Sequence, residues 1–431
     1  MSFDFLLCLL VVFTLASLGS PIALSMIVGA IVYMLSSGQD VALAGEQIIQ
    51  GLYNGFILLA VPLFIVAANI MNAGSISDRL LNFCVALVGH LRGGMGHVNV
   101  VSSLIFSGMS GSAVADAAGV GKVVIGMMTK EGRYPPGYAA AITAASATIG
   151  PIIPPSIPMV IYALVSGTSV GYLFIAGLVP GLIMGFVLMA MNTLMSTRLG
   201  AVQEERVPLK KLPGITWRAF PTLLMPAILL YGIYGGVTTP TEAAAVAAAY
   251  ALFLALAVYR SLSMKALLKV FQESAHTSAS VGLVISAALI FNYIVATENI
   301  PTQVAQLLVS WELSNFQFLM TINMLFLLLG MVLDATTVIL VIVPLLVPAC
   351  RELGIDLVHF GIITVMNLMI GLITPPYGIL LFVINGTTKI PINEIVRNVV
   401  PFIIVLIGAL MLLTSLPDLV LYMPRMFGYD G

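Results

Sequence analysis

Charge is scarce in this sequence. Lys and Arg account for 17 of the 431 residues and Asp and Glu for 18, so the formal net charge is −1. Hydrophobic residues make up 60% of the chain, whereas soluble globular domains contain about 45–50%. This balance excludes a soluble globular domain and argues against nucleic acid or a polybasic membrane surface as the partner. It predicts an integral membrane protein.

Cysteine pairs and catalytic motifs are also missing. The chain has three cysteines, which are scattered among apolar residues without the spacing of a zinc site or a disulfide framework: Cys8, Cys84 and Cys350. The phosphate-binding loop GxxxxGK[ST] is absent, because Gly121-Lys122 is followed by Val123. Neither HExxH nor GxSxG occurs. The sequence therefore predicts that the protein is not an enzyme and has no organic cofactor.

Long apolar runs are what the sequence has instead. Runs of roughly 17–25 residues, enough to cross a bilayer, recur along its whole length. We expect one integral membrane domain over 1–431, with an all-α polytopic fold. Two apolar regions, at about 96–120 and 315–349, carry small and polar residues near their middles. They are typical of re-entrant helical hairpins; ordinary spans with a Gly-rich packing face are the alternative.

The chain also resembles itself. The motif from Gly150 to Pro155 recurs 221 residues later, from Gly371 to Pro376, with a glycine, an isoleucine and two prolines in matching places. This indicates an internal duplication in which each half contains a hairpin, a proline-broken helix and a closing span. The first repeat is expected at 52–197, with its broken helix at 139–164. Inter-repeat spans follow at 198–277 and include an interfacial helix at 260–276. The second repeat is expected at 278–421, with its broken helix at 358–386.

Basic residues are unevenly placed around the two hairpins. Those beside the first hairpin are Arg79, Arg92, Lys122, Lys130 and Arg133. Between 298 and 358 the sole basic residue is Arg351. By the positive-inside rule the first hairpin enters from the cytoplasm and the second from the opposite face. The two repeats are therefore predicted to be inverted.

The proline pairs suggest why each helix is broken. Pro154 and Pro155 would free the carbonyls of Gly150 and Pro151, because a proline removes one N–H and displaces the carbonyl four residues earlier. Free carbonyls suit a hard cation such as Na⁺, and the N-terminus of the half-helix beyond the break suits an anion. A proline kink that only shapes packing is the alternative.

The hairpin tips are expected to form the other side of such a site. The first reads SGMSGS, residues 107–112, and the second GMVLDATT, residues 330–337. An acid at membrane depth is a candidate functional residue, which singles out Asp334; a cap on the hairpin backbone is its alternative role. Asp116 fits either role. Ser156 and Thr374, beside the two proline pairs, are weaker candidates.

No Lys or Arg falls within the broken segments or the hairpin tips. An anionic substrate would thus be stabilised by helix dipoles, hydroxyls and bound cations. This favours coupling to Na⁺, whereas protonation of Asp334 would give H⁺ coupling instead.

Taken together, the strings GMSGSAVADAAGVG, EGRYPPGYAAAITAASATIGPIIPPSIP, LGMVLDATT and GLITPPYG resemble the large membrane subunit of tripartite ATP-independent periplasmic (TRAP) transporters over essentially the whole chain. The resemblance implies a Na⁺-driven elevator-type transporter of bacterial inner membranes. It implies a small four-helix membrane subunit as a separate partner and a periplasmic binding protein that delivers an organic acid, for which sialic acid is our best choice.

The resemblance also implies site residues. The substrate would contact Ser112, Ser156 and Asp334. Na⁺ would bind where each hairpin tip meets a broken helix, at the following residues: Ser107, Ser110, Gly111, Gly150 and Pro151 in the first repeat, and Gly330, Gly371 and Thr374 in the second. The alternative is an autonomous Na⁺- or H⁺-coupled dicarboxylate or anion carrier that needs no soluble partner.

Overall fold

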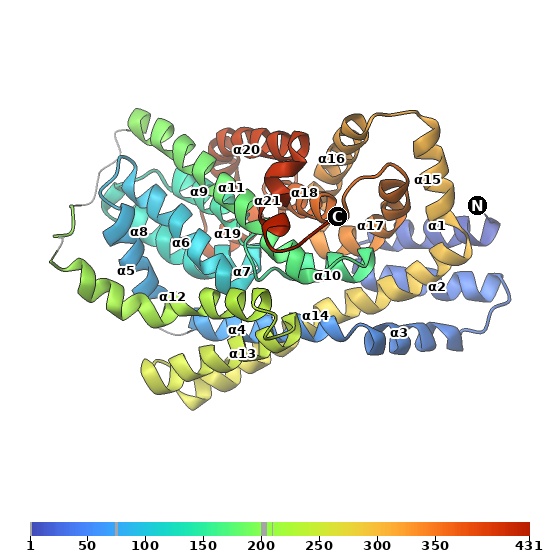
Figure 1. Cartoon of the computed structure of the whole chain (residues 1–431), viewed down its shortest axis with the longest axis horizontal. Helices are drawn as coiled ribbons and strands as arrows, with labels where there is room; N and C mark the ends of the chain where they lie inside the picture. The colour runs from blue at the N-terminus through green and yellow to red at the C-terminus, as the bar shows by residue number, and fades with distance from the viewer. Residues whose placement is uncertain (1, 74–75, 200–204, 209) are drawn as a thin grey trace.

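The computed structural model describes residues 2–73, 76–199, 205–208 and 210–431. The regular secondary structure of these residues is helical (Figure 1). Among them, seven helical segments are long and apolar enough to span a membrane: Phe56–Ala73, Val170–Arg198, Pro240–Val258, Met264–Thr297, Asn315–Val332, Ala335–Glu352 and Ile392–Ser415. The prediction of an all-helical polytopic protein is confirmed.

The described residues of the first half, up to residue 199, form eleven α-helices. They are α1 (Phe3–Ser17), α2 (Ile22–Ser36), α3 (Ala42–Asn54), α4 (Ala60–Ala73), α5 (Ile76–Val88), α6 (Gly94–Ser110), α7 (Ala113–Asp116), α8 (Lys122–Thr129), α9 (Pro136–Ala147), α10 (Ile157–Ser166) and α11 (Val170–Leu199). A π-helical segment, Ala117–Gly121, joins α7 to α8.

The second half continues with ten more. They are α12 (Leu212–Tyr234), α13 (Pro240–Phe253), α14 (Met264–Thr297), α15 (Ile300–Ser310), α16 (Asn315–Val332), α17 (Ala335–Glu352), α18 (Leu357–Gly371), α19 (Ile379–Thr388), α20 (Ile392–Ser415) and α21 (Pro417–Met426).

Local signals explain where several helices begin. Thr239 and Ser314 each start a capping box, in which the side chain three residues later, Glu242 or Gln317, bonds back to the first residue of the pair. Proline occupies the first or second position of α9, α10, α12, α13 and α21, where its missing N–H leaves no helical hydrogen bond unmade. The chain thus marks its helix starts by sequence even inside apolar runs.

The same order of elements occurs twice. In the first half, α6 turns at Gly111 into α7 and α8, and an interrupted helix follows as α9 and α10. In the second half, α16 turns into α17, and α18 and α19 form the interrupted helix. Each interruption contains one cis peptide bond, Pro154–Pro155 in the first and Pro375–Pro376 in the second.

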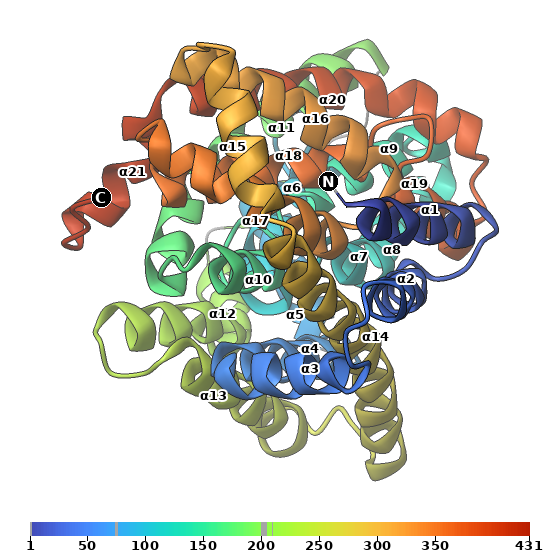
Figure 2. The same ribbon diagram turned by 90° about the vertical axis from the view of Figure 1, so that its right-hand side faces the viewer.

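The helices pack as two groups. Figure 1 shows α3, α4 and α12–α14 along the lower side, beneath α6–α11 and α16–α21. Within the lower group α4 packs on α13 and α14, and α14 also contacts α2 and α3, as Figure 2 shows from the side. In the upper group α9 packs on α20 and α10 on α17, so the two halves of the chain interleave.

The predicted interfacial helix at 260–276 and the span after it are continuous in the structure. Residues from Met264 onward form the first turns of α14, which continues without a break to Thr297. The sequence HTSAS at 276–280 contains neither proline nor glycine to end the helix. Residues 200–204 and 209 of the inter-repeat region lie outside the described residues.

Candidate functional site

The first hairpin tip packs directly on the first helix break. Gly111 has a left-handed φ of +59° and ends α6. A Cβ at this position would lie 2.5 Å from the Pro155 carbonyl oxygen, a distance that no side chain tolerates. Gly150 approaches the same tip from the other side, because its Cβ would lie 3.5 Å from the Ser112 carbonyl carbon. The glycine at position 111 lets the two backbones touch, whereas a Cβ on Gly150 would make an ordinary van der Waals contact with this tip.

The second tip meets the second break in the same way. A Cβ on Gly371 would lie 2.6 Å from the carbonyl carbon of Gly330. The Gly378 N–H donates to the Met331 carbonyl at 3.2 Å, so a hydrogen bond also joins the tip to the break. The second tip and the second break are therefore in direct backbone contact at Gly330 and Gly371.

Two of the predicted substrate residues cap the helices that follow the tips. The Ser112 hydroxyl accepts from the Ala115 N–H at 3.4 Å at the start of α7. The Asp334 carboxylate accepts from the Thr337 N–H at 3.0 Å and from the Thr337 hydroxyl at 2.5 Å at the start of α17. The capping role considered for Asp334 is thus present in the structure, and it leaves acceptor capacity on both oxygens.

Three predicted hydroxyls turn back onto their own backbone. Ser156 donates to the Pro151 carbonyl at 2.5 Å and Ser107 to the Leu104 carbonyl at 2.7 Å. Thr374 donates to the Ile370 carbonyl at 2.7 Å. Ser156 therefore occupies one lone pair of a carbonyl that the sequence analysis expected to be free. Ser110 differs, since its buried hydroxyl has no hydrogen-bond partner among the residues that the structure describes.

A cavity of about 380 Å³ lies where these elements converge, a size typical of small-molecule sites. Its walls come from both tips, both breaks and helices α4 and α14 of the lower group. The polar residues among its lining are Asn69, Ser110, Ser112, Thr277, Asp334 and Thr336. Ser110, Gly111, Ser112, Pro151 and Asp334 of the predicted site line it, and Ser156 does not.

The cavity has an unusual charge distribution for an anion site. Among the described residues that line it, Asp334 is the sole charged one, and neither Lys nor Arg is present. Two helices begin at its wall, since Ser112 and Asp334 are the N-caps of α7 and α17, and a helix N-terminus carries partial positive charge. This matches the sequence expectation that no basic side chain reaches the site.

The sequence analysis missed the wall formed by the lower group. Asn69 on α4 donates to the Ser274 hydroxyl on α14 at 2.9 Å, and Thr277 lies one turn further along α14. It also missed buried polar contacts between α6 and α9 and between α16 and α18. The repeat could have revealed the contact between α16 and α18. The polar residues Thr143 and Ser146 of α9 correspond, 221 residues later, to Thr364 and Asn367 of α18.

Comparison with known proteins decides the family. The family described as "Tripartite ATP-independent periplasmic transporter, DctM component" matches residues 8–419. The chain belongs to this family. It is therefore the large membrane component of a TRAP transporter, a multi-pass protein of the inner membrane and not an enzyme.

Individual relatives agree with this assignment. The DctM-family chain is 40% identical to the sialic acid TRAP transporter large permease protein SiaM of Vibrio cholerae, over 95% of this chain and 96% of the relative. It is 36% identical to the sialic acid TRAP transporter permease protein SiaT of Haemophilus influenzae, over 97% of this chain and 68% of the relative. It is 39% identical to the C4-dicarboxylate TRAP transporter large permease protein DctM of Pseudomonas aeruginosa, over 86% of this chain and 87% of the relative.

A solved structure supports the fold. The YdaH transporter of Alcanivorax borkumensis superimposes on this DctM-family chain with a TM-score of 0.62, covering 86% of this chain and 87% of that one. The sequences are only 15% identical, so the likeness concerns the fold alone. The family transports organic acids, and the named substrates of its members differ.

Proposed function

We propose that the chain carries an organic acid inward, driven by a Na⁺ gradient, and that the acid is a sialic acid. The observation that carries this proposal is the convergence of both tips and both breaks on one cavity without a lining Lys or Arg. An acid bound there needs positive charge from helix N-termini and from cations that travel with it. The 40% identity to a sialic acid permease favours that substrate.

Na⁺ would bind at the two places where a tip meets a break. The first site comprises Ser107, Ser110, Gly111, Gly150 and Pro151. The unpartnered Ser110 hydroxyl supplies a free oxygen there, and Pro151 keeps one carbonyl lone pair beside the Ser156 hydroxyl. The second site comprises Gly330, Gly371 and Thr374, where two backbones approach closely enough for carbonyl oxygens of both to reach one ion.

The substrate would bind between the tips, against Ser112 and Asp334. Both residues line the cavity and cap helices that point their N-termini at it. Ser156 would act indirectly, because its hydroxyl donates to the Pro151 carbonyl oxygen at 2.5 Å and fixes the orientation of that carbonyl. A hydroxyl-rich acid suits this arrangement, because its carboxylate meets helix N-termini and its hydroxyls can donate to the Asp334 carboxylate.

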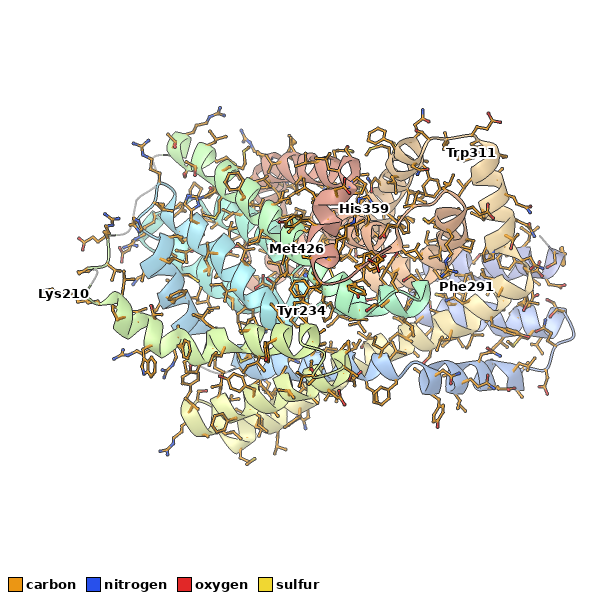
Figure 3. All side chains as sticks on the ribbon, in the orientation of Figure 1. Lys210, Tyr234, Phe291, Trp311, His359 and Met426 are labelled. Carbon is orange, nitrogen blue, oxygen red and sulfur yellow. The ribbon has the colours of Figure 1, made fainter. Side chains whose placement is uncertain are left out.

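We propose an elevator movement for the transport step. In this scheme α6–α8 and α16–α17 are re-entrant hairpins that move with the two broken helices, whereas α4 and α12–α14 stay fixed. The cavity lies between the proposed moving and fixed parts, with Asn69 and Thr277 on the fixed wall. Figure 3 shows Lys210 and Trp311 near opposite ends of the molecule; by the positive-inside rule the Lys210 end faces the cytoplasm.

The proposed transporter contains two partner proteins besides this chain. A TRAP transporter is tripartite by name, so this chain works with partner subunits. We propose that they are a small four-helix membrane subunit and a periplasmic binding protein. The H. influenzae relative is longer than this chain, which covers 68% of it, and the remainder leaves room for a fused small subunit.

Radiolabelled sialic acid uptake into proteoliposomes tests the proposal. The vesicles contain this chain with its small subunit under an inward Na⁺ gradient, with or without the binding protein. We expect uptake only when the binding protein is present. Uptake without it would favour the autonomous carrier, and uptake of a C4-dicarboxylate in place of sialic acid would move the substrate to the branch of the P. aeruginosa relative.

A further inference from the structure

A buried polar cluster joins α6 to α9 in the first repeat. Its members are Asn99, Ser103, Thr143 and Ser146, all of which are buried. Asn99 donates its amide N–H to the Thr143 hydroxyl at 2.5 Å, and Ser146 donates to the Asn99 amide oxygen at 3.0 Å. Ser103 donates to the Ser146 hydroxyl at 3.1 Å. This α6–α9 cluster is separate from the tip and break residues that line the cavity.

Asp116 lies buried beside this cluster. It is the last residue of α7, it is 1% exposed, and its carboxylate faces the Ser103 hydroxyl. Within the described part of the chain, neither carboxylate oxygen has a hydrogen-bond partner of ordinary geometry. Among the described residues, no Lys, Arg or His forms an ion pair with it. An isolated buried carboxylate is costly, so a positive charge or a proton must neutralise it.

The hydroxyls of the α6–α9 cluster have partners within the cluster and its helices. The Thr143 hydroxyl lies 2.8 Å from the Ala139 carbonyl, the Ser146 hydroxyl 3.0 Å from the Asn99 amide oxygen, and the Ser103 hydroxyl 3.1 Å from the Ser146 hydroxyl. Ser103 also faces the Asp116 carboxylate, but a neutral hydroxyl cannot neutralise a buried charge. The two side chains place a carboxylate and a hydroxyl oxygen side by side, and oxygen ligands are what a hard cation prefers.

The second repeat lacks this acid. Ser112 and Asp334 correspond at an offset of 222 residues in the hairpins, and the same offset matches Asp116 to Val338, which is fully buried. There the Asn367 amide N–H donates to the carbonyl and the side-chain oxygen of Asn323, at 2.7 and 3.0 Å. The hairpin fold thus forms without an acid at this position. The π-helical segment Ala117–Gly121 follows Asp116 directly, and such segments are frequent at functional sites.

We propose that the Asp116 carboxylate and the Ser103 hydroxyl bind a further Na⁺ ion, at a third site apart from the two tip and break sites. This inference rests on the proposed Na⁺ coupling. Na⁺ supplies the missing positive charge and accepts oxygen lone pairs from both side chains. Asp116 is four residues past Ser112, about one helical turn, so the ion would stabilise the tip that lines the cavity.

Binding of ²²Na⁺ to the purified chain with its small subunit tests the site without a transport readout. We expect D116N, which keeps the shape and removes the charge, to bind one Na⁺ fewer per chain than the unchanged protein. S103A should keep the number but weaken one ion about tenfold or more, since even an outer-shell partner of a metal site contributes that much. Asp418→Asn is the matched control, because Asp418 is exposed and pairs with Arg425 at 2.6 Å.

The outcomes separate this inference from the proposed function. If D116N folds and binds as many Na⁺ ions as the unchanged protein, the third site is wrong. The third site is also wrong if D116N changes only the pH dependence of uptake, because Asp116 then holds a proton. If D116N does not fold, an unchanged Na⁺ affinity in S103A overturns the site. No ²²Na⁺ binding to the unchanged protein would overturn the Na⁺ coupling itself.

Discussion

Gly330 and Gly371 touch through their backbones, although 40 residues separate them in sequence. A Cβ on Gly371 would lie 2.6 Å from the Gly330 carbonyl carbon, 2.7 Å from its Cα and 3.0 Å from its carbonyl oxygen. All three atoms belong to the backbone, so no side chain can move aside. The contact therefore ties the second hairpin tip to the second break at one fixed distance.

Gly371→Ala is expected to separate this tip from its break. The added methyl group overpacks the contact, at a cost of about 1–3 kcal/mol, and displaces the carbonyls proposed to hold Na⁺. We predict a lower melting temperature and at least a severalfold rise in the Na⁺ concentration for half-maximal uptake. Gly408→Ala is the matched control, since Gly408 has no neighbouring atom within 4 Å of its Cβ position. Unchanged Na⁺ dependence in Gly371→Ala would remove this contact from the second Na⁺ site.

Gly111→Ala is expected to disrupt the first tip by two effects. The left-handed φ of +59° costs a residue with a Cβ about 1–2 kcal/mol, and the Cβ would also lie 2.5 Å from the Pro155 carbonyl oxygen. Gly354→Ala separates the effects, because Gly354 has a φ of +66° with nothing within 4 Å. Thermal unfolding and Na⁺-driven uptake should suffer more in Gly111→Ala. Equal losses in the two variants would show that backbone strain alone matters.

Variants of Asp334 distinguish capping from transport. Asparagine caps a helix about as well as aspartate, whereas alanine costs about 1 kcal/mol. We predict that Asp334→Ala lowers the melting temperature and Asp334→Asn does not. Both should reduce uptake about tenfold or more, because each loses a charge-assisted hydrogen bond to the substrate. Full uptake in Asp334→Asn would leave the residue with the capping role alone.

Glu298, just beyond α14, accepts hydrogen bonds from Ser2, the residue that precedes α1. Hydrogen bonds from the Ser2 side chain and backbone and from the Tyr33 hydroxyl hold the pKa of this carboxyl below its usual range. A lowered pKa gives stability above about pH 4.3, the ordinary value for Glu, which is lost as the pH falls through the lowered pKa. Because the carboxyl is close to solvent, the effect is at most about 1 kcal/mol.

Glu298→Gln should therefore melt slightly below the unchanged protein at pH 7, and the difference should shrink as the pH falls below about 4.3. Thermal unfolding over a series of pH values measures it. A difference that stays constant with pH would assign the contribution to shape and not to charge. Asp418→Asn serves as a control for the loss of an exposed acid near the other terminus.

Much of the architecture could be predicted from local sequence. The recurrence of Gly150 as Gly371 identified both helix breaks, and the tips were found from SGMSGS and GMVLDATT. The sequence analysis also expected each hairpin tip to lie against a break. The structure places Gly111 and Gly371 at such contacts, where a Cβ would meet the opposite backbone at 2.5–2.6 Å.

Long-range packing could not be predicted in this way. Nothing local to Asn69 or Thr277 indicates that α4 and α14 form a wall of the cavity, because both lie far in sequence from the tips. The orientation of the Ser156 hydroxyl toward the Pro151 carbonyl depends on a turn whose geometry the proline pair permits but does not dictate. The burial of Asp116 beside Ser103 likewise depends on how α7 packs against α6, which local sequence does not specify.

The central claim is that a Na⁺ gradient drives the transport of an organic acid. Its most direct test is sialic acid uptake into proteoliposomes of this chain with its small subunit and binding protein, under either a Na⁺ gradient or an H⁺ gradient alone. We predict accumulation with the Na⁺ gradient, none with the H⁺ gradient, and release when the Na⁺ gradient is reversed. Accumulation driven by the H⁺ gradient in the absence of Na⁺ would contradict the claim.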